Sequence, residues 1–292
     1  MSDTLVTARR LGKSFGRKTV FSDLSFRVEP GDVVGVLGKN GAGKTTLLEI
    51  ILGFSPASSG TVQVFGHDSF RLPAAAKARI GFVPQQDELL DPLRAADQLR
   101  TFAAFYPRWD EALIARLCAA WEVDTEARIK TLSVGQRQKL SILLALGHHP
   151  DLLILDEPVA SLDPLGRRQF LEQIIDIVAD RRRAVVLSSH IVSDIERLAN
   201  KIWILKDGAL HWSGDTDALK ERVVRLHIRT AAPLPELPPL PNLLSIVRDD
   251  RYLCAIATDW SDADAARLHG ALGVMPEIET LTLEDIFLAL HQ

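Results

Sequence analysis

The chain has 292 residues, a formal net charge of −4 and 47% hydrophobic residues. This length accommodates one large domain and a small one, or two domains of medium size, with a sizeable core. The near balance of charge gives no electrostatic case for nucleic acid, and no apolar run approaches the roughly 18 residues of a membrane span.

Residues 4–37 predict β-structure that ends in a short apolar run, 32–37, with the sequence DVVGVL. The β-branched residues of this run are typical of a buried strand. The run is followed by GKNGAGKTT at 38–46, and residues 45–52 predict a helix with leucine and isoleucine on its buried side. The glycines therefore lie where a strand turns into a helix.

A glycine-rich turn at such a position forms an anion site. Glycine lets backbone N–H groups point inward, and the following helix adds the positive end of its dipole. The spacing of a P-loop is matched by Gly38, Gly43, Lys44 and Thr45. In that motif Lys44 reaches the β- and γ-phosphates, Thr45 gives its hydroxyl to Mg²⁺, and Thr46 donates to a phosphate oxygen. The strand before and the helix after disfavour the alternative, a glycine-rich turn with a surface lysine.

Further strands are predicted at 61–65 and 80–83, and a helical pattern extends over 91–149. Within that pattern, residues 132–136 read LSVGQ, and Ser133 and Gln136 have the spacing of a capping box. A serine-capped helix N-terminus with a glycine, here Gly135, is also an anion site. The stretch therefore predicts a helix start that can also hold a phosphate.

An apolar run at 152–155 is typical of a central parallel strand. It ends in Asp156 and Glu157, at the sheet edge where α/β proteins bind ligands. We expect Asp156 to hold Mg²⁺ through its water shell and Glu157 to accept a proton from an attacking water. The alternative is a pair of solvated acids at the start of a loop.

The rest of the chain predicts two more helices, a hairpin and a small appendage. Asp163 and Pro164 predict the N-cap and first turn of a helix to about Ala179. A strand at 184–188, a helix at 193–199, and a hairpin of strands 202–205 and 209–212 around the turn 206–208 come next. The five prolines between 233 and 241 predict a stiff extended connection, and they precede a hairpin (244–247 and 252–257) and two short helices, the last beginning near Thr282. We expect domains at 1–221 and 222–292, the second a small α+β unit.

These motifs, in this order, resemble those of the ABC transporter ATP-binding subunits over roughly residues 4–220. LSVGQ resembles the family signature LSGGQ, and the acid pair resembles the Walker B motif. The other matches are the Q-loop at 80–85, with Gln85 as its glutamine and Gln86 as the alternative, the D-loop at 160–163, the switch histidine at His190, and Phe15 where an aromatic residue stacks on adenine.

The resemblance implies an α/β P-loop ATPase of the ABC type, with an N-terminal antiparallel β-subdomain, a helical insert at about 86–150 and the C-terminal α+β appendage. It implies ATP and Mg²⁺ as cofactors. The implied nucleotide contacts are Phe15, Gly38, Asn40, Gly41, Gly43, Lys44, Thr45, Thr46, Ser133, Gly135, Gln136 and Asp163. The implied metal contacts are Thr45, Gln85 and Asp156, and the implied catalytic residues are Glu157, His190, Lys44 and Gln85.

Two positions depart from the usual family pattern. Val134 replaces the first signature glycine, and a β-branched residue restricts the backbone and adds bulk beside a phosphate. This departure bears on how tightly an ATP-bound dimer closes. Phe15 stands where tyrosine is more frequent, which keeps the stacking face and loses a hydroxyl.

The resemblance also implies partners. In this family the signature of one subunit closes over ATP bound to another, so one P-loop and one signature per chain imply a dimer with itself or with a similar ATPase subunit. The insert is implied to dock on a transmembrane permease subunit encoded as a separate chain. Apolar residues around 89–93 and 102–106 are candidates for the contact, and the alternative is that they are ordinary core of the insert. The segments 105–110 and 283–287 are similar to those of bacterial exporter subunits.

We therefore expect a subunit that energises an exporter from the cytoplasmic face of the inner or plasma membrane, without a nucleic-acid partner. The N-terminus has no apolar signal core, and Cys118 and Cys254 are expected to be buried thiols of a reducing compartment. The alternatives are a soluble ABC-type ATPase that acts on ribosomes or nucleic acid, and a P-loop kinase. Residues 222–292 are compatible with a ligand-sensing or dimer-forming module.

Overall fold

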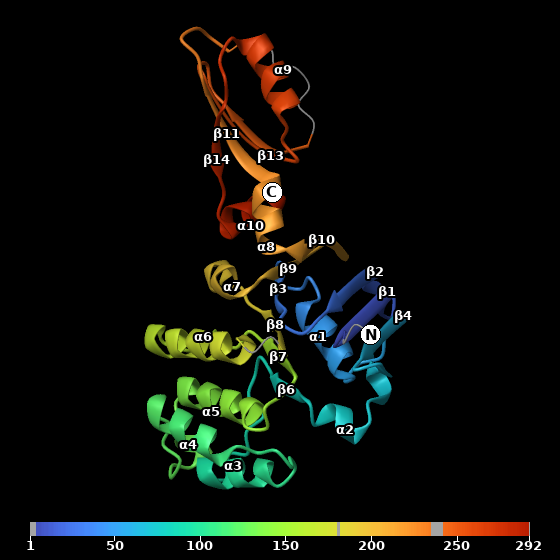
Figure 1. Cartoon of the computed structure of the whole chain (residues 1–292), viewed down its shortest axis with the longest axis vertical. Coiled ribbons are helices and arrows are strands. Elements are labelled where there is room, and N and C mark those ends of the chain that lie inside the picture. Colours follow the sequence, from blue (N-terminus) through green and yellow to red (C-terminus); the bar gives the residue numbers. More distant parts are fainter. Residues whose placement is uncertain (1–3, 180–181, 235–241, 292) are drawn as a thin grey trace. The chain divides into compact units, whose positions relative to one another are not determined.

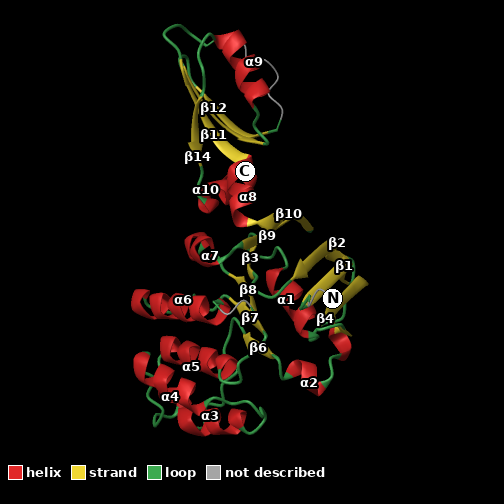
Figure 2. Ribbon diagram, viewed as in Figure 1, coloured by secondary structure: helices red, strands yellow, loops and turns green. Residues whose placement is uncertain are grey.

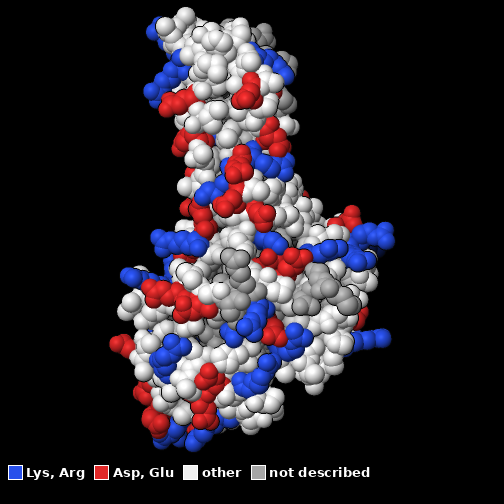
Figure 3. Space-filling view, viewed as in Figure 1, with Lys and Arg blue, Asp and Glu red and all other residues white. Residues whose placement is uncertain are grey.

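The computed structural model describes residues 4–179, 182–234 and 242–291. It divides into two compact units, Met1–Ser213 and Gly214–Gln292, whose elements are labelled in Figure 1 and coloured by type in Figure 2. On the face shown in Figure 3, side chains of both charges are interspersed. No helix among the described residues has the length and apolar character needed to cross a bilayer.

An antiparallel sheet begins the first unit, in the strand order β2-β1-β4-β5. Its strands are β1 (Val6–Phe15), β2 (Lys18–Val28), β4 (Ser59–Val64) and β5 (His67–Asp68). Val6 faces both Val28 and Val64, which sets the register of the sheet. β1 continues to pair with β2 as far as Phe15, although register shifts after Ala8 interrupt its alternation.

A second sheet, in the order β10-β9-β3-β8-β7-β6, forms the centre of this unit. Its strands are β3 (Val33–Leu37), β6 (Ile80–Val83), β7 (Leu152–Asp156), β8 (Ala184–Ser188), β9 (Lys201–Lys206) and β10 (Ala209–Asp215). The pairs from β6 to β9 are parallel, and every residue of β3, β7 and β8 is buried, as the continuous apolar runs predict. Phe26 and Trp203, with ring centroids 4.2 Å apart, join the two sheets in one core.

The helices of the first unit lie between these strands along the chain. They are α1 (Lys44–Leu52), α2 (Ala74–Lys77), α6 (Pro164–Val178) and α7 (Val192–Leu198), with the insert helices α3 (Ala95–Ala103), α4 (Glu111–Ala120) and α5 (Val134–Leu146). Of these, α1, α6 and α7 directly follow β3, β7 and β8. Short 3₁₀ helices lie at Ser69–Arg71 and Ile129–Thr131. Because parallel strands share one carboxyl edge, the loops before α1, α6 and α7 meet there.

The second unit is an antiparallel sheet in the order β12-β13-β11-β14. Its elements are α8 (Thr216–Arg222), β11 (Val223–Arg229), β12 (Leu243–Arg248), β13 (Tyr252–Thr258), α9 (Asp262–Leu272), β14 (Glu277–Thr280) and α10 (Leu283–Leu290). A small core of Ile228, Leu253, Ala255 and Leu268 joins the sheet to α9. The hairpin predicted at 244–247 and 252–257 is β12 and β13, whereas α8, β11 and β14 were not predicted.

Two further predictions from the sequence concern the two cysteines and the proline-rich connection. Cys118 is buried, but Cys254 is only half-buried, because the sheet face on which it lies is open to solvent. Four of the five prolines in the predicted stiff connection, Pro235, Pro238, Pro239 and Pro241, lie outside the described residues. α8 packs on β11 and so belongs with the second unit.

Candidate active site

The glycine-rich loop between β3 and α1 has the backbone that its composition predicts. Gly41 and Gly43 have φ angles of 82° and 99°, in the left-handed region that favours glycine. A Cβ on Gly43 would lie 2.6 Å from Cγ1 of Val20, which leaves no room for a side chain. Lys44 is buried, and its Nζ donates to the Gly38 carbonyl at 2.9 Å. The backbone of the loop therefore fixes the position of the Lys44 side chain.

Two buried acids end β7, and a serine on the neighbouring strand fixes them. Asp156 pairs with Ser188 in the register of β7 and β8. The Ser188 hydroxyl donates to Oδ1 of Asp156 at 2.5 Å and accepts the Glu157 N–H at 3.0 Å. Glu157 has a φ of 51°, which turns the chain sharply at the end of the strand. Ser188 was not predicted, although its place at the end of an apolar strand was a signal for it.

His190 follows β8 and contacts the second acid. Its Nδ1 lies 2.6 Å from Oε2 of Glu157, and its backbone N–H donates to the same oxygen at 3.1 Å. An ionised carboxylate only accepts hydrogen bonds, so Nδ1 carries the proton in this contact. The His190 side chain is 56% exposed, whereas that of Glu157 is 9% exposed. His190 thus holds the acid from its solvent side.

A cavity of about 410 Å³, a volume that suits a small organic ligand, brings together most of the residues predicted around the P-loop and the acids, although Gly38 and His190 do not line it. It is lined by Phe15, Lys18, Val20, Asn40, Gly41, Gly43, Lys44, Thr45, Thr46, Gln85, Asp156 and Glu157. Gln85 lines it and Gln86 does not, which favours Gln85 as the Q-loop glutamine. Lys18 and Val20 were not predicted, because they belong to a strand that carries no motif. Nζ of Lys13 lies 4.7 Å from the centroid of the exposed Phe15 ring.

The signature and the D-loop lie elsewhere on the unit. Ser133 and Gln136 form the predicted capping box at α5, with both hydrogen bonds at 3.2 Å. A Cβ on Gly135 would lie 3.3 Å from the Ser161 carbonyl of the D-loop. Asp163 caps α6 by accepting the Gly166 N–H at 2.6 Å. None of these signature and D-loop residues lines the cavity, so one chain does not bring its own signature to its own P-loop.

The signature also carries Val134, which begins α5 and is 66% exposed. Its side chain therefore stands on the open face of the signature, where any approaching molecule would meet it.

A second cavity, of about 320 Å³, lies between the insert and the core of this unit. Its lining includes Phe54, Phe82, Leu89, Phe102, Tyr106 and His148. Leu90 and Phe105 are exposed nearby in the sequence. His148 is buried against Tyr106, and burial lowers its pKa to about 4. The cavity is thus a mainly apolar recess in the part of the chain predicted to meet a partner.

The first cavity has the donor set of a nucleotide site. Thr45, Gln85 and Asp156 offer oxygen atoms, which Mg²⁺ prefers. Among the described residues, no cluster of three His, Cys, Asp or Glu side chains could hold a metal. Mg²⁺ in such sites is held by one or two carboxylates together with substrate phosphates, so these residues fit the ion. The fold and this site define a P-loop nucleoside triphosphatase.

The comparisons with known proteins narrow this class. The family described as ABC transporter matches residues 21–160. The Nod factor export ATP-binding protein I of Paraburkholderia xenovorans strain LB400 is 32% identical over 99% of this chain and 98% of its own length. The ABC transporter ATP-binding protein YtrB of Bacillus subtilis strain 168 is 31% identical over 77% of this chain and 76% of its own. A solved ATP-binding subunit of an ABC transporter is 28% identical, with a TM-score of 0.68 over 74% of this chain and 92% of its own.

This chain belongs to the family of ABC transporter ATP-binding subunits. It binds and hydrolyses ATP as the ATPase subunit of such a transporter, which sets aside the ribosome-associated and kinase alternatives.

Proposed function

We propose that the chain drives an exporter as one half of an ATP-closed dimer, with the permease on a separate chain. The separation of the signature from the P-loop cavity within one chain carries this proposal, because a complete site then requires a second ATPase subunit. The relative from Paraburkholderia xenovorans, similar along the whole chain, bears an export name. We place the protein on the cytoplasmic face of the membrane.

Six cavity residues, with His190 beside Glu157, then have roles in binding and hydrolysis. Lys44 binds the β- and γ-phosphates, and Phe15 stacks on the adenine. Thr45, Gln85 and Asp156 would hold Mg²⁺, which would supply positive charge against the phosphates. Glu157 orients the attacking water and takes its proton, while the γ-phosphoryl group passes to that water and ADP leaves. His190 holds Glu157 and contacts the γ-phosphate.

The partner dimer subunit completes the site. Ser133 and Gly135 of one chain donate to the γ-phosphate held by the other, with Gln136 and Asp163 fixing the helix starts beside them. Catalysis of this kind is mostly positioning and charge stabilisation. The second cavity, with Leu89 and Phe102 in its wall, receives a segment of the permease. The second unit is an accessory domain that senses a ligand or supports the dimer.

The test is a pull-down with tagged Glu157→Gln protein from detergent-solubilised native membranes in the presence of Mg·ATP. Recovery of a multi-spanning membrane protein supports the proposal and identifies the permease. Recovery of ribosomal proteins or nucleic acid without a membrane protein overturns it. The matched control is Lys44→Ala, which we expect to recover less permease if docking depends on the ATP-bound state.

A further inference from the structure

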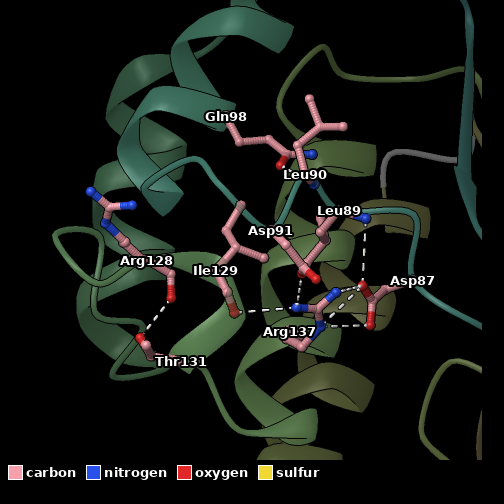
Figure 4. A network of polar contacts seen from close by, with 9 residues as sticks. All are labelled: Asp87, Leu89, Leu90, Asp91, Gln98, Arg128, Ile129, Thr131 and Arg137. Carbon is pink, nitrogen blue, oxygen red and sulfur yellow. Dashed lines mark hydrogen bonds and ion pairs between the residues drawn. The ribbon is translucent and has the colours of Figure 1, made fainter.

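Arg137 joins α5, the helix that begins in the signature, to Asp87 in the segment between β6 and α3 (Figure 4). Its Nε lies 3.1 and 3.0 Å from the two carboxylate oxygens of Asp87, and its Nη2 lies 2.5 Å from Oδ1. Its Nη1 donates to Oδ1 of Asp91 at 2.6 Å and to the Ile129 carbonyl at 3.2 Å. One guanidinium thus joins the first turns of α5 to two acids of another segment.

The contact with Asp87 is the firmer part of this network. The side chains of Arg137 and Asp87 are 20% and 17% exposed, whereas that of Asp91 is 60% exposed. Paired hydrogen bonds between a guanidinium and a carboxylate keep their geometry better when they are shielded from water than an exposed ion pair does. The hydrogen bond from Arg137 also lowers the pKa of Asp87, so this carboxylate stays charged at neutral pH.

The contact with Arg137 holds the part of the segment nearest Gln85, whereas Gln98 and the backbone of Ile129 and Lys130 hold its later residues. Residues 84–94 lie between β6 and α3 and contain no helix or strand. Asp87 accepts the Leu89 N–H at 3.4 Å, a bond within the segment, whereas its contact with Arg137 reaches a different element. Gln85, two residues before Asp87, lines the nucleotide cavity. A shift of Gln85 therefore displaces Asp87 through two peptide units.

Arg137 is equally close to the signature. Its backbone N–H donates to the Ser133 carbonyl at 2.9 Å, and Ser133 accepts the Gln136 N–H through its hydroxyl. The side chain and backbone of one residue therefore connect Asp87 to Ser133. Both connections lie within the first unit, and each is made by hydrogen bonds.

We propose that Arg137 is a positioning residue that couples the nucleotide cavity of a chain to the signature which that chain offers to its partner. A change at Gln85 moves Asp87, Asp87 moves Arg137, and α5 turns Ser133 toward or away from the partner's nucleotide. The inference rests on the proposed dimer, because only there does the signature meet ATP. The proposal assigns this coupling to the contact between Arg137 and Asp87, which links Gln85 on one side to Ser133 on the other.

The test compares Arg137→Gln, Asp87→Asn and the double variant in the full chain. We expect the ATP affinity of the P-loop to stay within about twofold of wild type while kcat falls about tenfold. The double variant should lose no more kcat than the worse single variant, because both remove the same contact. In a Glu157→Gln background, Arg137→Gln should weaken the ATP-dependent dimer in light scattering.

The matched control is Arg225→Gln, which removes an ion pair with two acids, Glu279 and Asp285, from an arginine side chain that is 23% exposed in the second unit. It should leave kcat unchanged at a similar cost in Tm. A wild-type kcat in Arg137→Gln, or additive losses in the double variant, would overturn the inference. If Arg137→Gln does not fold, Asp87→Asn decides by the same kcat and affinity criteria. A Glu157→Gln protein that stays monomeric with ATP contradicts the proposed dimer instead.

Discussion

Nδ1 of His190 lies 2.6 Å from Oε2 of Glu157, and the backbone N–H of the same histidine donates to that oxygen at 3.1 Å. One residue therefore holds one carboxylate oxygen with two donors. Because β7 and β8 are paired neighbours, the contact is supported by the sheet. The acid at the wall of the nucleotide cavity thus has a fixed orientation before any water is placed.

Glu157→Gln should separate ATP binding from hydrolysis. The amide keeps the size of the side chain and can accept from His190, but it cannot take a proton from water. We expect ATP affinity within about twofold of wild type and turnover reduced about 100-fold or more, measured by nucleotide titration and phosphate release. Glu172→Gln, an exposed acid on α6, is the control. Turnover equal to wild type in Glu157→Gln would remove this acid from the role.

Lys44→Ala should weaken ATP binding itself. The buried ammonium donates to the Gly38 carbonyl, and it has further N–H groups to offer to phosphates. Loss of charge-assisted hydrogen bonds should raise the Kd for ATP about tenfold to 100-fold in a nucleotide titration. Lys39→Ala changes an exposed lysine of the same loop and should change the Kd far less. Equal effects of the two variants would contradict the assignment.

Gly43→Ala should destabilise the fold more than Gly41→Ala. Both glycines have positive φ, but a Cβ on Gly43 meets Val20, whereas a Cβ on Gly41 meets nothing within 4 Å. Backbone strain alone should lower the free energy of unfolding by about 1 kcal/mol in Gly41→Ala, and strain with overpacking by about 3 kcal/mol in Gly43→Ala. Denaturant unfolding measures both. If the two losses are equal, contact with Val20 is not the cause.

Acid should destabilise the chain through His148. Burial lowers the pKa of His148 from 6.5 to about 4, and its Nε2 donates to the Ile80 carbonyl at 3.1 Å. Between these values the unfolded chain binds more protons than the folded chain, so the free energy of unfolding falls as pH drops. From pH 7 to pH 5 this residue should account for a loss of about 2 kcal/mol.

Denaturant unfolding of wild type and His148→Gln at both pH values checks this prediction. The variant should lose less stability on acidification than wild type. His67→Gln, which changes an exposed histidine of β5, should retain the wild-type loss. An unchanged loss in His148→Gln would assign the acid sensitivity to other groups.

Structural features that are specified by residues close together in the sequence were predictable. The capping box of Ser133 and Gln136 and the N-cap of Asp163 each lie within one helical turn, and the structure confirms both. The fully apolar strand β7 was also clear. β14 was missed because all its residues are exposed, which removes the alternation that marks a strand. Residues 223–229 do alternate, but the expected domain boundary fell just before them, between residues 221 and 222, and the strand was missed.

The individual residues of the site were predictable from their motifs, whereas the contacts between distant residues were not. Phe15, Gln85 and the two acids line one cavity, as their motifs led us to expect. The contacts Arg137–Asp87 and Ser188–Asp156 join residues 50 and 32 positions apart in the chain. No local periodicity specifies such pairs, because Ser188–Asp156 arises from the register of β7 and β8 and Arg137–Asp87 from the packing of α5 against the segment after β6.

The strand order has a consequence for biosynthesis. β8 lies between β3, which precedes the P-loop, and β7, which carries the acids, and it also supplies Ser188. A growing chain on the ribosome therefore exposes its P-loop long before the strand that joins β3 to β7 has been translated. Pairings between distant segments form late in folding. We therefore expect a fragment that ends before residue 184 to hydrolyse no ATP, because it lacks the strand and the serine that hold the two acids.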